Sequence, residues 1–456
     1  MKEYTDEYLE HIRKVIHDND IDQARKELKE LHPADIAELY QNLDLEEAEY
    51  LYKLLDEDTA ADVLMELDED DRRKLLDAMP AEQIAKQIDH LDTDDAVDLI
   101  QQLDEEDRDE ILSHIDDVEQ AGDIIDLLKY DEDTAGGLMG TEMIVVNENW
   151  SMPECIKQMR MQAEDMDEIY YVYVVDDDHK LRGVLPLKKL ITHPSVSKIK
   201  HVMETDPVSV KVDTPIDDVT LDFEKYDLVA MPVVDSIGRL LGRITVDDVM
   251  DQVRESTERD YQLASGLSSD VDADDSIFAQ TKARIPWLLI GIASGILASL
   301  ILGTFEAKLE AVTALALFIP IIGGTGGNVG VQASAIVVQS LANGTLEIKE
   351  FSRQLGKEVL IGLMNATIIS SVVLVYNLIT LPHEFAVTIS VAVSLFIVVM
   401  FATILGTVVP LTLEKLHINP ALATGPFIQI SNDIVGLVIY VQVATYFLGV
   451  FGTPVP

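Results

Sequence analysis

The chain has 456 residues, and its 34 Lys and Arg against 82 Asp and Glu give a formal net charge of −48. That balance excludes a nucleic-acid binder, because such proteins need basic surfaces to neutralise phosphates. Residues 1–284 hold 74 acids and 29 bases, whereas residues 285–456 hold only 8 acids and 5 bases. The composition therefore predicts an integral membrane protein with a large acidic soluble part.

The acidic N-terminal sequence MKEYTDEYLE has no apolar core of the signal-peptide type. We therefore expect residues 1–282 to stay in the cytoplasm. The single cysteine, Cys155, excludes an internal disulfide framework and fits a reducing compartment.

Residues 1–133 carry an acidic repeat with a period of twelve, in which an apolar residue precedes a polar one from Leu43-Asp44 to Ile115-Asp116. The spacing predicts an all-α domain of short helices with Asp or Thr at their N-caps, stacked as a superhelix. This region holds 45 acids and 13 bases. Its acids either form a solvated face or offer cation ligands, as the cluster Asp94, Asp95 and Asp98 does for Mg²⁺ or Ca²⁺. Self-repulsion favours the second interpretation.

From residue 134 β-branched strands alternate with helices, and the pattern repeats after 59 residues. Val174-Val175-Asp176 is followed by Gly183, and Val233-Val234-Asp235 by Gly242 at the same interval. Each copy reads as helix, strand, polar turn, strand and helix, which resembles a CBS domain. We therefore expect an α/β tandem CBS pair in residues 134–200 and 201–246.

CBS pairs often bind adenine nucleotides such as ATP. The second copy resembles the ligand signature through Gly242, Thr245 and Asp248, where the Asp would take ribose hydroxyls. The first copy has Pro186 and Lys189 where Thr and Asp would stand. The resemblance implies at most one nucleotide site per pair, and a purely structural pair is the alternative.

The second copy continues into a helix predicted from about Thr245 to Gly266, within a connecting segment of residues 247–282. Its carboxylates are Asp247, Asp248, Asp251, Glu255 and Glu258. Their spacing places most of them on one side of the helix, where they repel one another. This arrangement favours cation binding over a solvated spacer helix.

Residues 283–456 form a predicted five-span transmembrane domain. Its apolar runs are approximately 285–305, 311–341, 359–381, 385–413 and 424–452, each long enough to cross a bilayer core of about 30 Å. One side carries Lys282, Arg284, Lys349, Arg353, Lys357 and Lys415, whereas the opposite loops carry only Lys308. The positive-inside rule then places the N-terminus inside and the C-terminus outside a cell membrane.

The second span, FIPIIGGTGGNVGVQASAIVVQ, combines Pro320 with five glycines between 323 and 330. Such a sequence weakens a helix, so we expect irregular backbone that lines a permeation path. Asn328 and Gln332 support that interpretation. Close packing of small residues between helices is the alternative.

The fifth span begins at Gly425-Pro426 and contains Asp433, which we expect to be the only acid deep within a span. A carboxylate at that depth costs about 2.5 to 3.5 kcal/mol on insertion scales, so its default role is functional and cation-facing. A protonated or helix-satisfied Asp433 is the alternative.

The order of acidic repeat, DTAGGLM linker, CBS pair, connecting helix and five spans resembles the MgtE family of magnesium channels. PIIGGTGGNVGVQ and NPALATGPF with Asp433 carry the most specific part of that resemblance. It implies a homodimer with one pore on the two-fold axis, where both copies of Asp433 recognise hydrated Mg²⁺. It also implies that Mg²⁺ bridges the repeat domain, the CBS pair and the connecting "plug" helix and so closes the pore.

Three positions depart from the family. This chain has Asn419 where the family usually has Asp, Asn432 where it has Thr, and Arg259 in place of an acid after Glu258. The first two belong to the pore region and bear on the ranking of ions.

Mg²⁺ dehydrates reluctantly, so a site with a few carboxylate and amide acceptors around a hydrated ion suits it. We expect Mg²⁺ uptake with negative feedback from cytosolic Mg²⁺. The alternatives are a channel for another divalent ion, such as Co²⁺ or Mn²⁺, and a membrane-anchored nucleotide sensor. We expect no enzymatic activity, because no nucleophile with a base and no phosphate loop with Lys is found.

Overall fold

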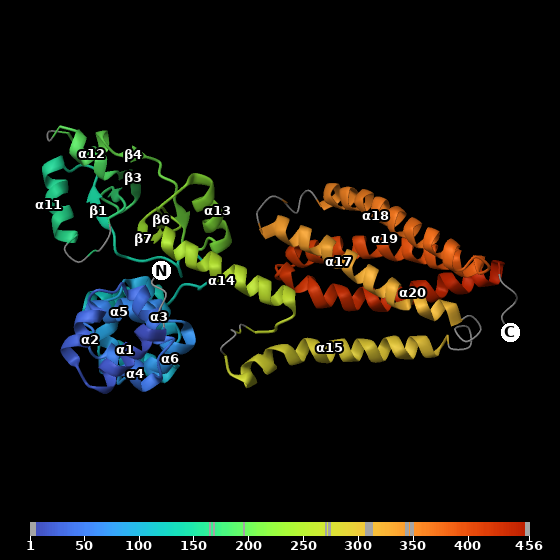
Figure 1. Ribbon diagram of the computed structural model, residues 1–456. Helices are drawn as coiled ribbons and strands as arrows, with labels where there is room; N and C mark the ends of the chain where they lie inside the picture. The colour runs from blue at the N-terminus through green and yellow to red at the C-terminus, as the bar shows by residue number, and fades with distance from the viewer. Residues whose placement is uncertain are drawn as a thin grey trace. The chain divides into compact units, whose positions relative to one another are not determined.

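The computed structural model describes residues 6–451, apart from 164–165, 167–168, 195–196, 270, 272–274, 306–312, 343–345 and 347–350. Figure 1 shows its helices and strands in chain order. The chain divides into two compact units, Met1–Gln252 and Val253–Pro456, and each is described by itself. Lys308 and Lys349, used above to predict the orientation, lie outside the described residues.

The first unit opens with short helices that confirm the predicted all-α repeat. They are α1 (Asp6–His17), α2 (Ile21–Leu28), α3 (Pro33–Tyr40), α4 (Leu45–Tyr52), α5 (Glu57–Glu66), α6 (Glu69–Asp77), α7 (Ala81–Ile88), α8 (Thr93–Gln101), α9 (Glu105–Leu112) and α10 (Val118–Leu127). From α3 to α9 a helix begins every twelve residues, often after an Asp cap such as Asp44 or Asp56. Alternate helices pack together, α3 on α5, α5 on α7 and α7 on α9, so each buries its apolar face against near neighbours.

Two small sheets follow. The elements of the first copy are β1 (Ile144–Asn147), α11 (Met152–Gln162), β2 (Val172–Val175), β3 (Leu181–Leu185), α12 (Leu187–Thr192), a 3-10 turn at Ile199–His201 and β4 (Glu204–Thr205). Those of the second are β5 (Val210–Lys211), α13 (Ile216–Tyr226), β6 (Ala230–Val234) and β7 (Leu240–Thr245). The strand orders are β1-β2-β3-β4 and β5-β6-β7, with the first pair parallel and the central hairpin antiparallel in each. This repeated arrangement confirms the CBS pair.

The linker before β1 pairs with the second copy of the repeat. Ala135 and Gly136 donate backbone hydrogen bonds to Thr214 and Val212, and Gly140 exchanges two with Arg243, each 2.9 Å long. The linker therefore carries the chain from the helical repeat across the second CBS copy before β1 begins.

Helix α14 (Val246–Ser265) confirms the predicted connecting helix within one residue at each end. The division between the two compact units falls inside it, after Gln252. Asp247, Asp248 and Asp251 therefore belong to the first unit, and Glu255 and Glu258 to the second.

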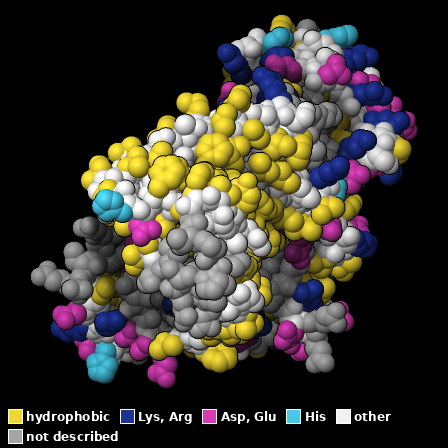
Figure 2. All heavy atoms as spheres, turned by 90° about the vertical axis from the view of Figure 1, so that its right-hand side faces the viewer, with side chains coloured by type: hydrophobic (Ala, Val, Ile, Leu, Met, Phe, Trp, Pro, Cys, Tyr) yellow, Lys and Arg dark blue, Asp and Glu magenta, His cyan; other side chains and the backbone are white. Residues whose placement is uncertain are grey.

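Among the described residues, five helices are long and apolar enough to cross a membrane, as predicted. They are α15 (Ile277–Gly303), α17 (Ile319–Ala342) with the preceding 3-10 turn Thr313–Phe318, α18 (Phe351–Thr380), α19 (Phe385–Lys415) and α20 (Gly425–Phe451). Many of their large apolar side chains are exposed, including Leu288, Leu300 and Leu360, and Figure 2 shows apolar side chains spread over one face. The chain is a multi-pass membrane protein.

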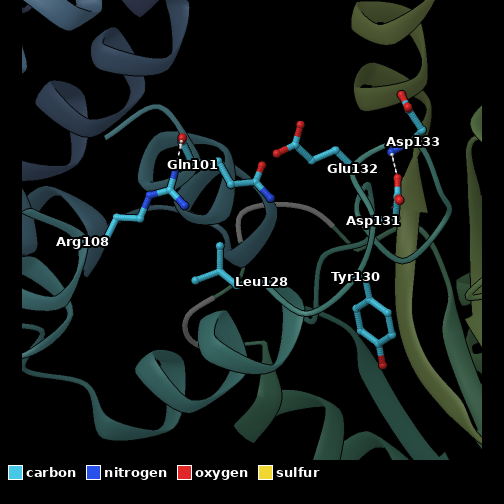
Figure 3. Close-up of a pocket in the computed structure, with 7 residues that line it drawn as sticks. All are labelled: Gln101, Arg108, Leu128, Tyr130, Asp131, Glu132 and Asp133. Atoms are coloured by element: carbon cyan, nitrogen blue, oxygen red, sulfur yellow. Dashed lines mark hydrogen bonds between the residues drawn. The ribbon is translucent and has the colours of Figure 1, made fainter. Parts of the chain in front are cut away.

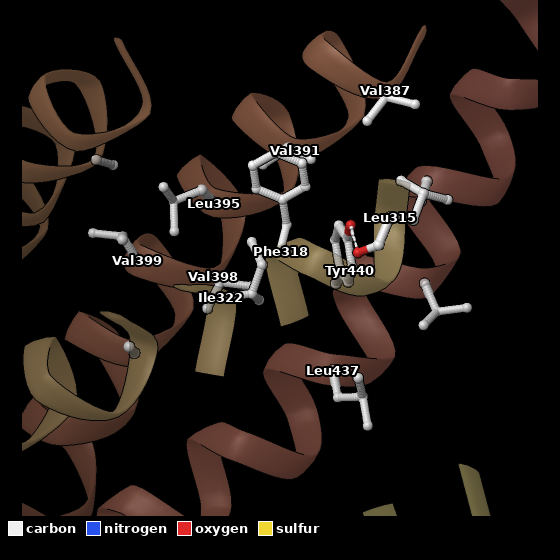
Figure 4. Close-up of a cluster of buried hydrophobic side chains, with 14 of the residues drawn as sticks. Leu315, Phe318, Ile322, Val387, Val391, Leu395, Val398, Val399, Leu437 and Tyr440 are labelled. Carbon is white, nitrogen blue, oxygen red and sulfur yellow. Dashed lines mark hydrogen bonds between the residues drawn. The ribbon is translucent and has the colours of Figure 1, made fainter. Parts of the chain in front are cut away.

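The core of this domain lies where α17, α19 and α20 meet. Figure 4 shows Phe318 and Ile322 close to Val391, Leu395 and other buried side chains of the cluster. Tyr440 is fully buried, and its hydroxyl donates a 2.7 Å hydrogen bond to the carbonyl of Leu315. This bond satisfies both polar groups in an apolar surrounding.

The expectation of irregular backbone in the second span is wrong, because α17 is one continuous helix through all five glycines. Its glycines allow close helix packing. A side chain at Gly326 would lie 2.7 Å from Val398 of α19, and a side chain at Gly406 of α19 would overlap the carbonyl oxygen of Gly330. Packing against two neighbours outweighs the weak helix propensity of glycine, as the small-residue alternative predicts.

The third membrane helix begins at Phe351, earlier than the predicted residue 359, and so includes Glu358. Glu358 is only 3% exposed, and Gln354 donates a 3.2 Å hydrogen bond to its carboxylate. Glu358 is thus a buried acid in the two turns that precede the predicted apolar run, which also contain Arg353 and Lys357. The hydropathy pattern placed Glu358 just outside the apolar run, although the helix itself begins two turns earlier.

Candidate cation sites

The first candidate site lies where α8 of the helical repeat meets the start of the CBS pair, within the first unit. The backbone N–H of Thr93 donates a 3.0 Å hydrogen bond to the Glu142 carboxylate, and the Thr141 N–H donates a 2.9 Å bond to the Thr93 hydroxyl. Glu142 therefore caps α8 from 49 residues away. Asp92, at the N-cap position, makes no capping hydrogen bond within the described residues.

Three carboxylates converge at this contact between α8 and the start of the CBS pair, which we call the acidic joint. Asp92, Asp94 and Glu142 each offer an oxygen, and these oxygens all lie within 4.8 Å of one another. Hard oxygen ligands at such separations suit Mg²⁺ or Ca²⁺.

Burial, and after it the charge of neighbouring carboxylates, raises the pKa of the acids around this cluster. Burial, together with the nearby carboxylate of Asp248, raises the pKa of Asp94 well above its usual value. The same two causes raise the pKa of Asp95 to about 7. Burial and Asp247 also raise the pKa of Asp248, although a hydrogen bond from Thr245 lowers it. Without a cation, burial and mutual repulsion therefore disfavour the charged forms of these acids in the folded state.

Two arginines offset part of this charge. Arg243 is 9% exposed and lies 3.7 Å from the Asp92 carboxylate. Arg72 is near Asp95 and Asp98, but its guanidinium also donates to the carbonyls of Leu64, Met65 and Leu67. The acids therefore still outnumber the buried cations.

The other predicted ligands lie apart from the three converging carboxylates. Asp98 is exposed one turn beyond Asp94, and Asp247 and Asp251 are exposed on α14. In the second unit, Glu258 is exposed, and Glu255 forms a 2.5 Å ion pair with Arg259. Of the predicted ligands, the structure brings Asp94, Asp95 and Asp248 close together, since the charge of Asp248 affects the pKa of both α8 acids.

Sequence reasoning missed Asp92, Glu142 and Arg243. In the sequence, Asp92 is one of the helix caps of the repeat, and Glu142 is a lone acid beside a glycine-rich linker. The position of Glu142 just after the linker is a weak signal, because only the fold brings its carboxylate to α8.

The predicted nucleotide residues have close neighbours in the structure. Both the N–H and the hydroxyl of Thr245 donate to the Asp248 carboxylate. A side chain at Gly242 would lie 2.6 Å from the carbonyl oxygen of Gly140 in the linker. Gly242 thus provides room for the linker, and Asp248 faces both Thr245 and the acids of α8.

The first unit has a pocket of about 470 Å³ near the end of the helical repeat. Gln101, Arg108, Leu128 and Tyr130 line it together with three consecutive acids, Asp131, Glu132 and Asp133, as Figure 3 shows. Arg108 donates to the backbone carbonyls of Leu103 and Gln101, so its guanidinium is part of the local helix packing.

The second candidate site is in the membrane domain, where α17 and α20 cross. Asp433 is half-buried, and one carboxylate oxygen lies 3.3 Å from the position that a side chain on Gly323 would occupy. The neighbouring Asn432 is 1% exposed, and its amide atoms have no hydrogen-bond partner among the residues that the structure describes. Its side chain packs against Gly330.

The other predicted pore residues are placed differently. Asn328 and Gln332 are exposed, one turn apart on α17, on a face that its packing partners leave open in the single chain. Asn419 precedes the 3-10 turn Pro420–Ala423, and its amide donates a 2.8 Å hydrogen bond to Asp260 of α14. Of the predicted pore residues, therefore, Asn432 and Asp433 are the two that lie against the glycines of α17 in the described part of the chain.

The helical repeat, paired CBS copies and five membrane helices define a multi-pass membrane transporter with a large soluble portion. The sequence family described as "Divalent cation transporter" matches residues 319–443. The "MgtE intracellular N domain" matches residues 31–133, and the CBS domain matches residues 135–195 and 199–255.

Two relatives make the assignment specific. The chain is 37% identical to "Magnesium transporter MgtE" of Thermus thermophilus over 71% of its own length and 72% of the relative. It is 31% identical to the protein of the same name from Enterococcus faecalis over 73% of each chain. The chain belongs to the MgtE transporter family.

Two solved structures are similar to the soluble part. One is "the soluble part of a magnesium transporter", with a TM-score of 0.50 and 31% identity over 54% of this chain and 97% of that one. The other is "the cytosolic domain of the Mg2+ channel MgtE in complex with ATP", with a TM-score of 0.51 and 32% identity over 53% and 98%.

Proposed function

We propose that this protein is a Mg²⁺-selective channel or transporter for magnesium uptake, closed by cytosolic Mg²⁺. The observation that carries the proposal is Asp433, a half-buried carboxylate of a membrane helix, set against Gly323 of α17. The names of the relatives, magnesium transporters, support the choice of ion and a transport role without enzymatic activity.

The pore chemistry suits a hydrated ion. In the proposed homodimer, two copies of Asp433 supply charge, while Asn432, Asn328 and Gln332 supply amides that hydrogen-bond to the waters of the ion. Because Mg²⁺ releases its waters reluctantly, a wide site that binds the hydrated ion costs less than a tight protein cage.

Regulation follows from the acidic joint of the first unit. Cytosolic Mg²⁺ bound by Asp92, Asp94 and Glu142, with Asp95 and Asp248 nearby, would relieve the repulsion that raises the pKa of these acids. Such binding favours the closed state only if that state holds the ion more tightly than the open state does.

The remaining predicted acids complete the proposal. Asp98, Asp247, Asp251, Glu255 and Glu258 would be outer ligands of regulatory ions on α8 and α14. The N-terminus and residues 1–282 would face the cytoplasm, and the C-terminus the outside of the cell membrane.

An adenine nucleotide is the second regulatory ligand we propose, at the CBS pair with Thr245 and Asp248. A relative's soluble domain was solved with ATP, which supports a nucleotide at this module. Asp248 would then serve both ligands, so nucleotide and Mg²⁺ binding should affect each other.

Uptake into proteoliposomes tests the proposed function. Asp433→Ala should abolish selective Mg²⁺ uptake, and Asp433→Asn should reduce it less, because an amide still accepts hydrogen bonds from water. Glu384→Ala, which removes an exposed carboxylate before α19, is the control. Unchanged uptake by Asp433→Ala would overturn the pore assignment and favour the membrane-anchored sensor. Equal competition by Co²⁺ or Mn²⁺ would favour a general divalent channel.

A further inference from the structure

The last turns of α14 pack against the segment that leads into α20, and both belong to the second unit. Helix α14 ends at Ser265, the 3-10 turn spans Pro420–Ala423, and α20 begins at Gly425. The contacts between them join parts of the chain that are about 160 residues apart in sequence.

Asn419 uses both ends of its side-chain amide at this joint. The Nδ2 group donates a 2.8 Å hydrogen bond to Asp260 of α14, and Oδ1 accepts a 2.8 Å bond from the backbone N–H of Ala421. The second bond caps the 3-10 turn. A carboxylate at this position could keep the cap, but it has no N–H to donate to Asp260.

Two glycines bring the backbones together beside this bond. Gly425 has φ +36°, and a side chain on it would overlap the carbonyl oxygen of Ala264. Gly266 has φ +83°, and a side chain on it would lie 2.6 Å from Cγ of Pro426. Both glycines adopt backbone conformations that L-residues rarely adopt, so the close contact is a specific feature of the chain.

The joint bears directly on the pore residue. Asp433 lies eight residues after Gly425 on the same helix, which is about 12 Å along its axis. A helix is stiff over two turns, so the position of its first turn determines where the carboxylate stands relative to α17.

We propose that Asn419 is a positioning residue whose amide ties α14 to the start of α20 without a cation and thereby holds Asp433 in place. This joint differs from the acidic joint at α8, where carboxylates face one another. The inference rests on the proposed function only for its effect on transport, because the contact itself can be measured without any flux.

Hydrogen exchange of the full chain in nanodiscs tests the contact. The amides of residues 261–267 should be protected in EDTA, and Mg²⁺ should change that protection little. Asn419→Asp keeps the cap but places a carboxylate against Asp260, so protection in EDTA should fall by about three- to tenfold, as expected for one lost hydrogen bond. Added Mg²⁺ should restore it by bridging the two carboxylates.

A reciprocal exchange separates this contact from a general loss of structure. Combining N419D with D260N returns a donor and an acceptor to the joint in opposite order, so protection in EDTA should recover. Asn149→Asp, an equal change of charge at an exposed site in the first CBS copy, should leave these amides unchanged. Wild-type protection that appears only with Mg²⁺, or an exchange that restores nothing, would overturn the proposal.

Transport gives the second readout. N419D should lower Mg²⁺ uptake at low cytosolic Mg²⁺, and the combined variant should regain it. If uptake is insensitive to every one of these variants while Asp433→Ala abolishes it, Asn419 does not position Asp433, although the proposed pore stands.

Discussion

The acidic joint of the first unit and the glycine-rich core of the second unit bring helices together by opposite means. At α8, carboxylates lie so close that burial and mutual repulsion raise the pKa of Asp95 to about 7. In the membrane domain, Gly330 and Gly406 let α17 and α19 approach until one backbone touches the other.

The contrast shows where a dissolved ion can act. A contact whose carboxylates repel one another is stabilised when a cation binds between them, so its formation depends on the cation concentration. A joint held by packing hardly responds to the ion, which suits a rigid frame around a permeation site. We infer that sensing and permeation are separated in this way, and the following predictions test the separation.

Deleting residues 1–133 should have the largest effect on regulation. The deletion removes Asp92, Asp94 and Asp95 and leaves Glu142 and Asp248 without their partners on α8. The channel should still conduct, but half-closure should need at least about tenfold more Mg²⁺, a shift typical of the coupling that one regulatory site supplies. Patch-clamp recording with graded cytosolic Mg²⁺ measures the shift, and an unchanged closure curve would place the sensor in the CBS pair and α14 alone.

Gly406→Ala should destabilise the membrane domain by about 1 to 3 kcal/mol, the usual cost of an overpacked core. The added methyl would overlap the Gly330 carbonyl and lie 3.1 Å from Ala333. Gly303→Ala is the matched control, because among the described residues nothing lies within 4 Å of the added methyl. Thermal unfolding in detergent compares the two, and equal midpoints would contradict the role assigned to close packing.

The acidic joint should make the first unit less stable as pH rises in EDTA. The folded-state pKa values of Asp94, Asp95 and Asp248 are raised, whereas an unfolded Asp titrates near 3.9. Between about pH 4 and pH 7 the folded state therefore binds more protons, and stability falls as pH increases through this window. Thermal unfolding followed by Trp150 fluorescence measures this slope, and Mg²⁺ should flatten it.

Asp94→Asn should raise the unfolding midpoint at pH 7.5 in EDTA and reduce the slope. A gain of about 1 kcal/mol corresponds to about 2–4 °C for a unit of this size. Asp109→Asn, at an exposed acid of α9, is the control. A lower midpoint for Asp94→Asn in EDTA would show that the joint does not suffer from charge repulsion.

Glu255→Ala should have the smallest effect on closure. Its carboxylate forms an exposed ion pair with Arg259, and such pairs contribute about 0.3–0.5 kcal/mol on a helix. Asp251→Ala, at another proposed outer ligand on the same helix, should shift the closing Mg²⁺ concentration more, because Arg259 already offsets the charge of Glu255. Equal shifts for the two variants would remove that distinction.

The sequence by itself determined the elements of this protein, because their signals are local. A twelve-residue period places the helix starts from α3 to α9, since a cap and an apolar face need only a few neighbouring residues. The five membrane helices follow from length and hydropathy, and the repeated Val-Val-Asp pattern follows the two CBS hairpins.

The tertiary structure alone decided which polar groups meet. Glu142 caps α8 from 49 residues away, and Asn419 reaches Asp260 across 159 residues, distances over which no local pattern carries information. It also decided that the glycines of α17 stay helical, because contacts with α19 and α20 supply the free energy that glycine's own propensity lacks.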